Sequence, residues 1–429
     1  MQTIMPNNRL LLILWSLLLF LGISCSKEED PVPDPVVVQN SKTAIYDAFK
    51  EWYFWLDKLP EVNPNSYSSD QELLEALRYD ELDRWSFIAP LDAYIALFQD
   101  AETKGFGVSM AQTLDKKLMV RFAYKQAPMG LVGVHRGWEI LKIDGVPVKN
   151  IPNLNVAFDT DNEVVFTFVT TANDTVEHAV TRADYKINTV LHRSVIDHNG
   201  TKVGYLVYES FIGDNTDELD EAFELFQSEG VEELVIDLRY NGGGRMDIAM
   251  TLGELIGGDE VVGQVMGKMI YNSKKSGDNI AFGTNKENPL RLNLDRLFFI
   301  TTKETASASE MMINSMFPYK EIVTLGQTTH GKPVGMSILQ AKKYNLALAP
   351  VTFKILNAND EGDYFNGIPV DYEVVDDIFK AWGNPQEACL SQALSVIDGS
   401  VIATSMKSTQ IHPVGIPLKR GLQKITGAH

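Results

Sequence analysis

A serine and a lysine that stand 25 positions apart have the residue types and the setting for acyl-transfer chemistry. Ser307 lies in T-A-S-A-S-E, after an apolar run at 297–302 that is typical of a buried strand and before apolar residues at helical spacing. A serine at such a turn lies at the positive end of the helix dipole, where developing negative charge is stabilised. Lys332 follows a further predicted strand at 321–325, on a loop from which its amine could accept the serine's proton. The pair predicts a serine hydrolase with a lysine base.

The segment that joins these two residues resembles the nucleophile and base segment of the C-terminal processing, or tail-specific, serine peptidases. The resemblance is carried by A-S-A-S-E, by the H-G-K that ends at Lys332, and by the strand-helix-strand setting. It implies that Ser307 is the nucleophile and that Lys332 is the base. Taken singly, the serine would be a helix N-cap and the lysine a solvated surface residue. His330 lies beside the lysine and is the alternative base if Lys332 does not serve.

A glycine-rich turn is predicted to supply backbone donors to the same site. The buried strand expected at 234–238 runs into R-Y-N-G-G-G at 239–244, which is similar to the D-L-R-x-N-x-G-G motif of the family. Glycines let the backbone approach a substrate and turn its N–H groups toward an oxyanion. By position, the resemblance implies that the oxyanion donors are the N–H groups of Gly243 and Ala308. A phosphate-binding role is disfavoured, because no Lys-Ser/Thr pair follows the glycines.

Residues 101–185 are predicted to form a β-rich module that binds peptides. The stretch K-G-F-G-V at 104–108 resembles the carboxylate-binding loop of a PDZ domain, whose backbone N–H groups hold a peptide's terminal carboxylate. The residues expected to bind the carboxylate are Gly105, Phe106, Gly107 and Val108. The stretch 133–146 resembles the R-G-D-x-I-x-x-I-N-G signature of the same domain, with Trp138 in the usual place of Asp. The resemblance implies polypeptide substrates with free, apolar C-termini.

The chain of 429 residues is long enough for two or three domains, and its composition is that of a globular protein. We expect a multi-domain α/β protein, with an N-terminal helical domain at 41–100 and a serine peptidase core at 186–400. The strand-helix-strand order at the start of the core favours parallel strands joined by right-handed crossovers. The family resemblance implies a core of the ClpP/crotonase-like kind. Asp237 and Arg239 are expected to form a structural ion pair. The sequence of the basic tail at 401–429 does not indicate a function for it.

Charge and composition exclude several classes of partner. The formal net charge of −19 disfavours nucleic acid and anionic membrane surfaces as ligands, because like charges repel. The sequence contains no H-E-x-x-H motif and no Cys/His spacing typical of a metal site. We therefore expect neither a metal nor another cofactor. The sequence does not indicate an oligomeric state.

The first 24 residues have the pattern of a signal peptide, with an apolar run at 10–23 that is short for a membrane span. Cys25 follows G-I-S, which resembles a bacterial lipobox, so residues 25–40 are predicted to be a linker with a lipid on Cys25. The acidic stretch at 26–30 resembles the export tag of surface lipoproteins of Bacteroidetes-type bacteria. The expected location is the bacterial cell envelope, anchored to the outer membrane by this lipid and facing the periplasm or the cell surface. A soluble secreted protein is the alternative.

The sequence favours an envelope serine endopeptidase that cleaves polypeptides near their C-termini through an acyl-enzyme. A free lysine has a pKa of about 10.4, so the mechanism requires Lys332 to lie in a largely dry site without a carboxylate partner. Many family members have Gln four residues after the lysine, where this chain has Met336. The alternative is a catalytically weak or inactive binding protein on the same fold that captures C-termini. A hydrolase of non-peptide esters is a further, weaker possibility.

Overall fold

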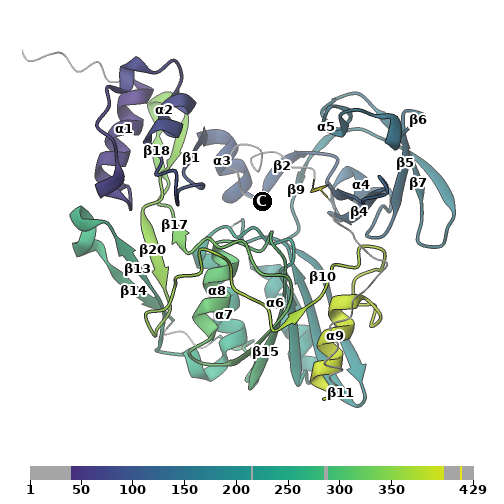
Figure 1. Cartoon of the computed structure of the whole chain (residues 1–429). Helices are drawn as coiled ribbons and strands as arrows, with labels where there is room; N and C mark the ends of the chain where they lie inside the picture. Colours follow the sequence, from purple (N-terminus) through teal and green to yellow (C-terminus); the bar gives the residue numbers. More distant parts are fainter. Residues whose placement is uncertain (1–39, 214–215, 285–287, 401–415, 418–429) are drawn as a thin grey trace, which may run out of the picture. The chain divides into compact units, whose positions relative to one another are not determined.

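The computed structural model describes residues 40–213, 216–284, 288–400 and 416–417 (Figure 1). The predicted signal peptide at 1–24, the predicted lipidation site Cys25 and most of the basic tail lie outside these residues. Within the described ranges, no helix has both the length and the apolar character that a membrane-spanning segment needs. The described chain mixes helices and strands throughout, which confirms the expected α/β class.

A six-stranded sheet forms the core, in the strand order β10-β11-β12-β15-β16-β21. Its strands are β10 Val190–His198, β11 Thr201–Tyr208, β12 Glu233–Asp237, β15 Arg296–Thr301, β16 Glu321–Gly326 and β21 Tyr372–Glu373. The strands from β11 to β21 are parallel to one another, and β10 is antiparallel at one edge. The parallel core expected from the strand-helix-strand order is therefore confirmed.

Helices cover both faces of this sheet, because successive residues of a buried parallel strand point to opposite faces and both faces are apolar. Phe299 of β15 packs in the cluster that also contains residues of α6, α7 and α8. Its neighbour Phe298 packs in the cluster on the other face, with α9. The helices are α6 Asp217–Glu229, α7 Met246–Gly257, α8 Ala308–Met316 and α9 Ala388–Ile397.

Two smaller sheets, in the orders β14-β13-β20-β17 and β1-β19-β18, extend the core. The first contains β13 Val265–Tyr271, β14 Ile280–Gly283, β17 Val334–Gly335 and β20 Phe353–Leu356. The second contains β1 Phe87–Pro90, β18 Leu339–Ala341 and β19 Leu346–Ala349. Strand β17 begins two residues after Lys332, so its pairing with β20 fixes one end of the loop that carries the lysine.

Residues 41–100 form three α-helices and the strand β1, which is antiparallel to β19. The helices are α1 Ser41–Trp52, α2 Asp70–Leu77 and α3 Leu91–Phe98. Phe49 and Trp85 share one hydrophobic cluster with Val334 and Val351. The N-terminal region therefore packs directly against the strand that follows Lys332.

The β-rich region contains a sheet in the order β22-β3-β4-β5-β7-β8, with β6 paired to β5. These strands are β3 Val108–Gln112, β4 Leu118–Ala123, β5 Glu139–Ile143, β6 Val146–Pro147, β7 Val164–Val169, β8 Thr175–Val180 and β22 Ile416–Pro417. Short helices α4 Pro128–Leu131 and α5 Leu154–Ala157 and the pair β2 Glu102–Gly105 and β9 Ala183–Lys186 complete the region. Its side chains bury a hydrophobic cluster of their own, from Phe106 to Val180.

Candidate active site

Ser307 stands at the turn between β15 and α8, in a backbone conformation that is rare for a residue with a side chain. Its φ is 58° and its ψ is −116°. A non-glycine residue at positive φ is strained, and such strain is characteristic of functional turns. The turn is held by Thr305, whose hydroxyl donates to the carbonyl oxygen of Leu238 at 2.8 Å and accepts from the N–H of Thr302 at 3.0 Å. The sheet thus presents the serine at the N-terminus of α8, as the sequence predicts.

The glycine turn after β12 lies directly against this serine. Gly243 has a φ of 97°, and a side chain there would bring its Cβ within 2.9 Å of the Cβ of Ser307 and of the nitrogen of Ala308. Only glycine fits so close an approach. The N–H of Gly243 donates to Oδ1 of Asn241 at 2.9 Å, and the Asn241 amide donates to the carbonyl of Tyr208 at 3.1 Å. The first predicted oxyanion donor is therefore beside the serine but hydrogen-bonded to Asn241.

The second predicted donor, the N–H of Ala308, belongs to the first residue of α8. The N–H groups of the first helical turn have no acceptor within their own helix. The group therefore remains suited to an oxyanion formed at the Ser307 turn. The second serine of the motif, Ser309, is not available as a nucleophile, because its buried hydroxyl donates to the carbonyl of Asn241 at 3.0 Å.

Glu310 connects the serine turn to the lysine loop. Its Oε2 accepts from the N–H of Ser307 at 2.9 Å and from the N–H of Lys332 at 2.8 Å. Its Oε1 accepts from the N–H of Gly331 at 2.6 Å and from the hydroxyl of Thr329 at 2.5 Å. Glu310 was not among the residues predicted from the sequence. The spacing S-x-x-E from Ser307 to Glu310 is that of a capping box and could have revealed it.

Lys332 is buried, with 9% of its surface exposed. Burial lowers the pKa of Lys332 to about 8, against the opposing effect of the charges on Glu310 and Asp83. The Glu310 carboxylate binds the backbone N–H of the lysine and not its amine. Among the described residues, no carboxylate forms an ion pair with Nζ, which satisfies the requirement for a dry site without a carboxylate partner. A hydrogen bond between Ser307 Oγ and Lys332 Nζ is also absent from the described residues, so proton transfer requires the two groups to approach.

Two other residues near Lys332, Met336 and His330, contact apolar side chains or a tryptophan. Met336 packs in hydrophobic clusters with Leu348 and with Phe87, so no amide at this position orients the lysine. Nε2 of His330 accepts a hydrogen bond from Nε1 of Trp85 at 3.1 Å. A neutral imidazole that accepts at Nε2 carries its proton at Nδ1 and has no second lone pair to act as a base. This geometry favours Lys332 over His330 as the base.

The predicted carboxylate-binding loop connects β2 to β3 in the β-rich region. Phe106 is buried in the module's hydrophobic cluster, and Gly107 has a φ of 73° at a place where a Cβ would overlap Ala127. Gly105 pairs with Ala183, and Val108 begins β3. The outer edge of β3 is partly covered, because Ile416 and Pro417 pair with Gln112 and Ala111. An added peptide strand would meet this segment.

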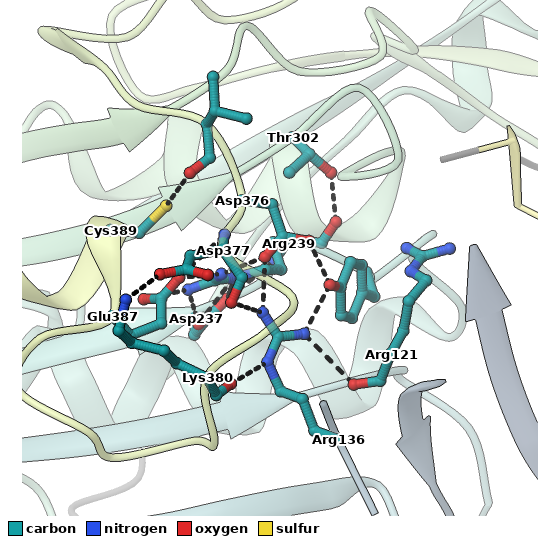
Figure 2. A network of polar contacts seen from close by, with 12 residues as sticks. Arg121, Arg136, Asp237, Arg239, Thr302, Asp376, Asp377, Lys380, Glu387 and Cys389 are labelled. Carbon is teal, nitrogen blue, oxygen red and sulfur yellow. Dashed lines mark hydrogen bonds and ion pairs between the residues drawn. The ribbon is translucent and has the colours of Figure 1, made fainter. Parts of the chain in front are cut away.

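A cluster of buried and half-buried charges lies at the carboxyl end of β12. We call it the ionic cluster; it contains Arg121, Arg136, Asp237, Arg239, Asp376 and Glu387. Arg239 forms ion pairs with Asp237, Asp376 and Glu387 at 2.7, 2.7 and 2.8 Å. Figure 2 shows its guanidinium among these carboxylates. The expected pairing of Asp237 with Arg239 is present, and the two carboxylates contributed by later residues were not foreseen.

Two arginines of the β-rich region extend the ionic cluster toward the serine turn. Arg136 pairs with Asp376 at 2.6 Å and donates to the hydroxyl of Tyr240 at 2.8 Å. Arg121 pairs at 2.7 Å with Glu304, three residues before Ser307. These contacts join the β-rich region to the two turns that carry the predicted oxyanion donors.

Comparison with known proteins identifies the same segments. Residues 202–374 match the description of peptidase family S41, and residues 40–87 match the S41 N-terminal domain. A "Probable CtpA-like serine protease" of Staphylococcus aureus is 25% identical over 244 residues, which are 56% of this chain and 47% of that protein. A carboxyl-terminal-processing protease of Picosynechococcus sp. is 25% identical over 219 residues, half of each chain. The chain thus spans about half the length of these curated relatives.

A solved structure extends the similarity to most of the chain. The crystal structure of a Bacteroides fragilis protein assigned to the S41 proteases has a TM-score of 0.71 and 25% identity. The aligned region covers 83% of this chain and 97% of that one. The fold is therefore shared with a solved protein over most of the chain.

Proposed function

Because this chain belongs to peptidase family S41, we propose that it hydrolyses peptide bonds with Ser307 as nucleophile and Lys332 as base. The observation that carries the proposal is a buried lysine, with its pKa lowered to about 8, joined through one carboxylate to a strained serine turn. At pH 7.5 a lysine of pKa 8 is neutral in roughly a quarter of the molecules, against about 0.1% for a solvated lysine. A neutral amine is what general-base catalysis requires.

In the proposed reaction, Ser307 Oγ attacks the carbonyl carbon of the scissile peptide bond and transfers its proton to Lys332 Nζ. The oxyanion is stabilised by the N–H of Ala308 and by the N–H of Gly243 once the substrate displaces Oδ1 of Asn241. The lysine then gives the proton to the leaving amine, and the C–N bond breaks to form an acyl-enzyme. Water, deprotonated by the same lysine, releases the acyl group and restores the serine.

The substrates in this proposal are polypeptides with free, apolar C-termini, bound by Gly105 to Val108 as a strand added to β3 in place of Ile416 and Pro417. Support comes from the loop sequence, from the position of that loop at the start of β3, and from the names of the curated relatives. A peptide with a free carboxylate should bind about tenfold or more tightly than its amidated form, because charge-assisted hydrogen bonds are lost on amidation. Equal affinities measured by calorimetry would remove C-terminal recognition from the proposal and leave peptide hydrolysis intact.

We also propose that the protein works in the bacterial cell envelope, anchored to the outer membrane by a lipid on Cys25. The lipobox-like sequence before this cysteine supports the proposal. Mass spectrometry of the native membrane fraction should detect a mature chain that starts at an acylated Cys25. An unmodified Cys25 in a soluble envelope extract would contradict it.

The catalytic assignment is tested with an unfolded polypeptide that ends in apolar residues. Ser307→Ala and Lys332→Ala should each reduce cleavage by about 10³-fold or more, and the double variant should be no worse, because the serine is not nucleophilic without its base. Ser309→Ala is the matched control, since its hydroxyl is bonded to Asn241, and it should keep most of the activity. Retained cleavage in Lys332→Ala together with loss in His330→Ala would reverse the choice of base.

A binding protein without turnover is the second candidate. The hydrogen bond from Gly243 N–H to Asn241 favours it, because that bond occupies one oxyanion donor. The two candidates differ in one measurement, the appearance of new peptide termini by mass spectrometry after incubation with excess polypeptide. Stoichiometric binding without new termini would select the binding protein.

A further inference from the structure

The loop from Thr329 to Lys332 is held on one side by the core and on the other by a segment far away in the sequence. Glu310 binds the inner side through the N–H groups of Gly331 and Lys332. On the other side, the indole N–H of Trp85 donates to Nε2 of His330 at 3.1 Å, across a sequence separation of 245 residues. The two rings meet edge to face, with centroids 6.3 Å apart.

Arg84 adds longer contacts to the same loop. Its guanidinium lies 3.4 Å from the carbonyl oxygens of His330 and Gly331 and 3.5 Å from that of Phe365. It also lies over the ring of Trp85, at 4.7 Å from the centroid. The carbonyl of Phe365 would be 2.4 Å from a Cβ at Gly331, so the loop is also in close contact with that segment. The backbone next to Lys332 is thus enclosed on several sides.

The segment that carries Trp85 is held by hydrogen bonds to the side chain of Asp83. The Asp83 carboxylate is buried and accepts from the hydroxyls of Tyr53 at 2.8 Å and Ser86 at 2.6 Å. It also accepts from the N–H groups of Trp85 at 3.1 Å and Ser86 at 2.9 Å. Trp85 is 4% exposed and packs against Phe365. A buried side chain held in this way can fix the position of its hydrogen-bond acceptor.

From these contacts we propose that Trp85, supported by Arg84 and Asp83, is a positioning residue for Lys332 and that His330 is the acceptor through which it acts. Neither Trp85 nor His330 touches the reacting atoms in this proposal. A positioning residue is needed because Met336 stands where many family members have a Gln that orients the lysine. In addition, the described residues supply no side-chain hydrogen bond to Nζ of Lys332. Its place must then be set by the backbone on either side of it. This inference rests on the proposed function.

The test separates loss of the hydrogen bond from loss of packing. Trp85→Phe keeps an aromatic ring and removes the N–H donor. Its matched control is Trp138→Phe, since Trp138 makes the same contact, Nε1 to Nε2 of His135 at 3.1 Å, inside the β-rich region. We expect Trp85→Phe to lower kcat for an unfolded polypeptide about five- to tenfold with KM within twofold, and Trp138→Phe to leave kcat unchanged. Circular dichroism and thermal unfolding establish that both variants are folded.

The role of His330 is tested by an acceptor that cannot act as a base. His330→Gln places an amide oxygen within reach of the indole and should keep most of the wild-type kcat, whereas His330→Leu should lose as much as Trp85→Phe. The double variant of Trp85→Phe with His330→Leu should be no slower than either single variant, because the pair acts through one hydrogen bond. Additive losses, or a kcat for Trp85→Phe equal to that of Trp138→Phe, would overturn the inference.

The proposed function and this inference fail in different ways. If wild-type turnover did not depend on Ser307, the proposed function itself would be wrong. If turnover depended on Ser307 and Lys332 but not on Trp85, only the positioning role would be wrong. If Trp85→Phe did not fold, the inference would be tested by comparing kcat of His330→Gln and His330→Leu, which leave the tryptophan in place.

Discussion

Two sites of this protein differ in how their charged groups are paired. In the ionic cluster, the guanidinium of Arg239 meets three carboxylates, and the carboxylate of Asp376 meets two arginines (Figure 2). Burial opposes ionisation of Asp376, but the charges of Arg136 and Arg239 hold its pKa well below the usual range. At the candidate active site, Lys332 is also buried, but its amine has no such partner among the described residues. Burial therefore prevails and lowers the pKa of Lys332 to about 8.

The difference lies in where the nearest carboxylate directs its oxygens. Glu310 is close enough to affect the lysine's charge, yet its oxygens bind backbone N–H groups and a hydroxyl. Glu387 instead binds the guanidinium of Arg239 directly. A paired buried charge stays charged and contributes to structure, whereas an unpaired buried amine titrates near neutral pH and can do chemistry.

The largest expected effect on stability comes from breaking the paired site. Arg239→Met should lower the free energy of unfolding by about 3–5 kcal/mol, because it leaves buried carboxylates without a partner. Arg193→Met is the control, since Arg193 pairs with an exposed Glu221 at the surface, and it should cost less than about 1 kcal/mol. Urea unfolding followed by circular dichroism measures both. Similar losses in the two variants would mean that the ionic cluster is not the structural element described here.

At the unpaired site, removal of the charged group should stabilise the protein. Lys332→Met should raise the free energy of unfolding at pH 7 by about 2–3 kcal/mol, because a buried amine with a lowered pKa disfavours the folded state while it is protonated in the unfolded one. The sign follows from proton binding: between about pH 8 and about pH 10.4 the unfolded chain binds more protons at Lys332. Wild-type stability should therefore rise across this range relative to Lys332→Met. A constant difference between the two proteins from pH 7 to pH 10.5 would contradict the lowered pKa.

A smaller effect is expected at Glu310, whose carboxylate joins the serine turn to the lysine loop. Glu310→Gln should reduce kcat by roughly 10- to 100-fold, because an amide has one acceptor oxygen. It can serve either the N–H groups of Ser307 and Lys332 or the donors of Thr329 and Gly331, but not both pairs. It should also shift the limb of the pH–rate profile that reports Lys332 to lower pH, since the carboxylate raises the pKa of the lysine. Stopped-flow kinetics with a chromogenic ester across pH 6–10 gives both quantities. A shift to higher pH would show that Glu310 affects the lysine in another way.

Local patterns made part of this site predictable. Strand β15, the turn at Ser307 and the start of α8 follow from an apolar run, a serine and helical spacing within about 20 residues of sequence. Asp237 and Arg239 are two positions apart on one strand end, so their pairing could also be expected. The resemblance to a known peptidase family supplied the roles of Ser307 and Lys332.

Contacts over long sequence separations could not be predicted in this way. Asp376 and Glu387 reach Arg239 from 137 and 148 positions away, and Trp85 reaches His330 from 245 positions away. Phe87–Pro90 forms a strand only because it pairs with Leu346–Ala349, since four residues ending in proline carry no strand pattern of their own. A pattern within one segment of the sequence does not indicate which distant residue will contact it. The predictions for Cys25 and the basic tail concern residues outside the described ranges.

The central claim is that Lys332 is neutral in a substantial fraction of molecules near pH 7.5. The most direct test is an NMR titration of lysines labelled with ¹³C at Cε, with the signal of Lys332 assigned by its absence in Lys332→Met. We predict that the Lys332 signal titrates with a pKa of about 8. A Lys332 signal that titrates above pH 10, as in a solvated lysine, would contradict the account.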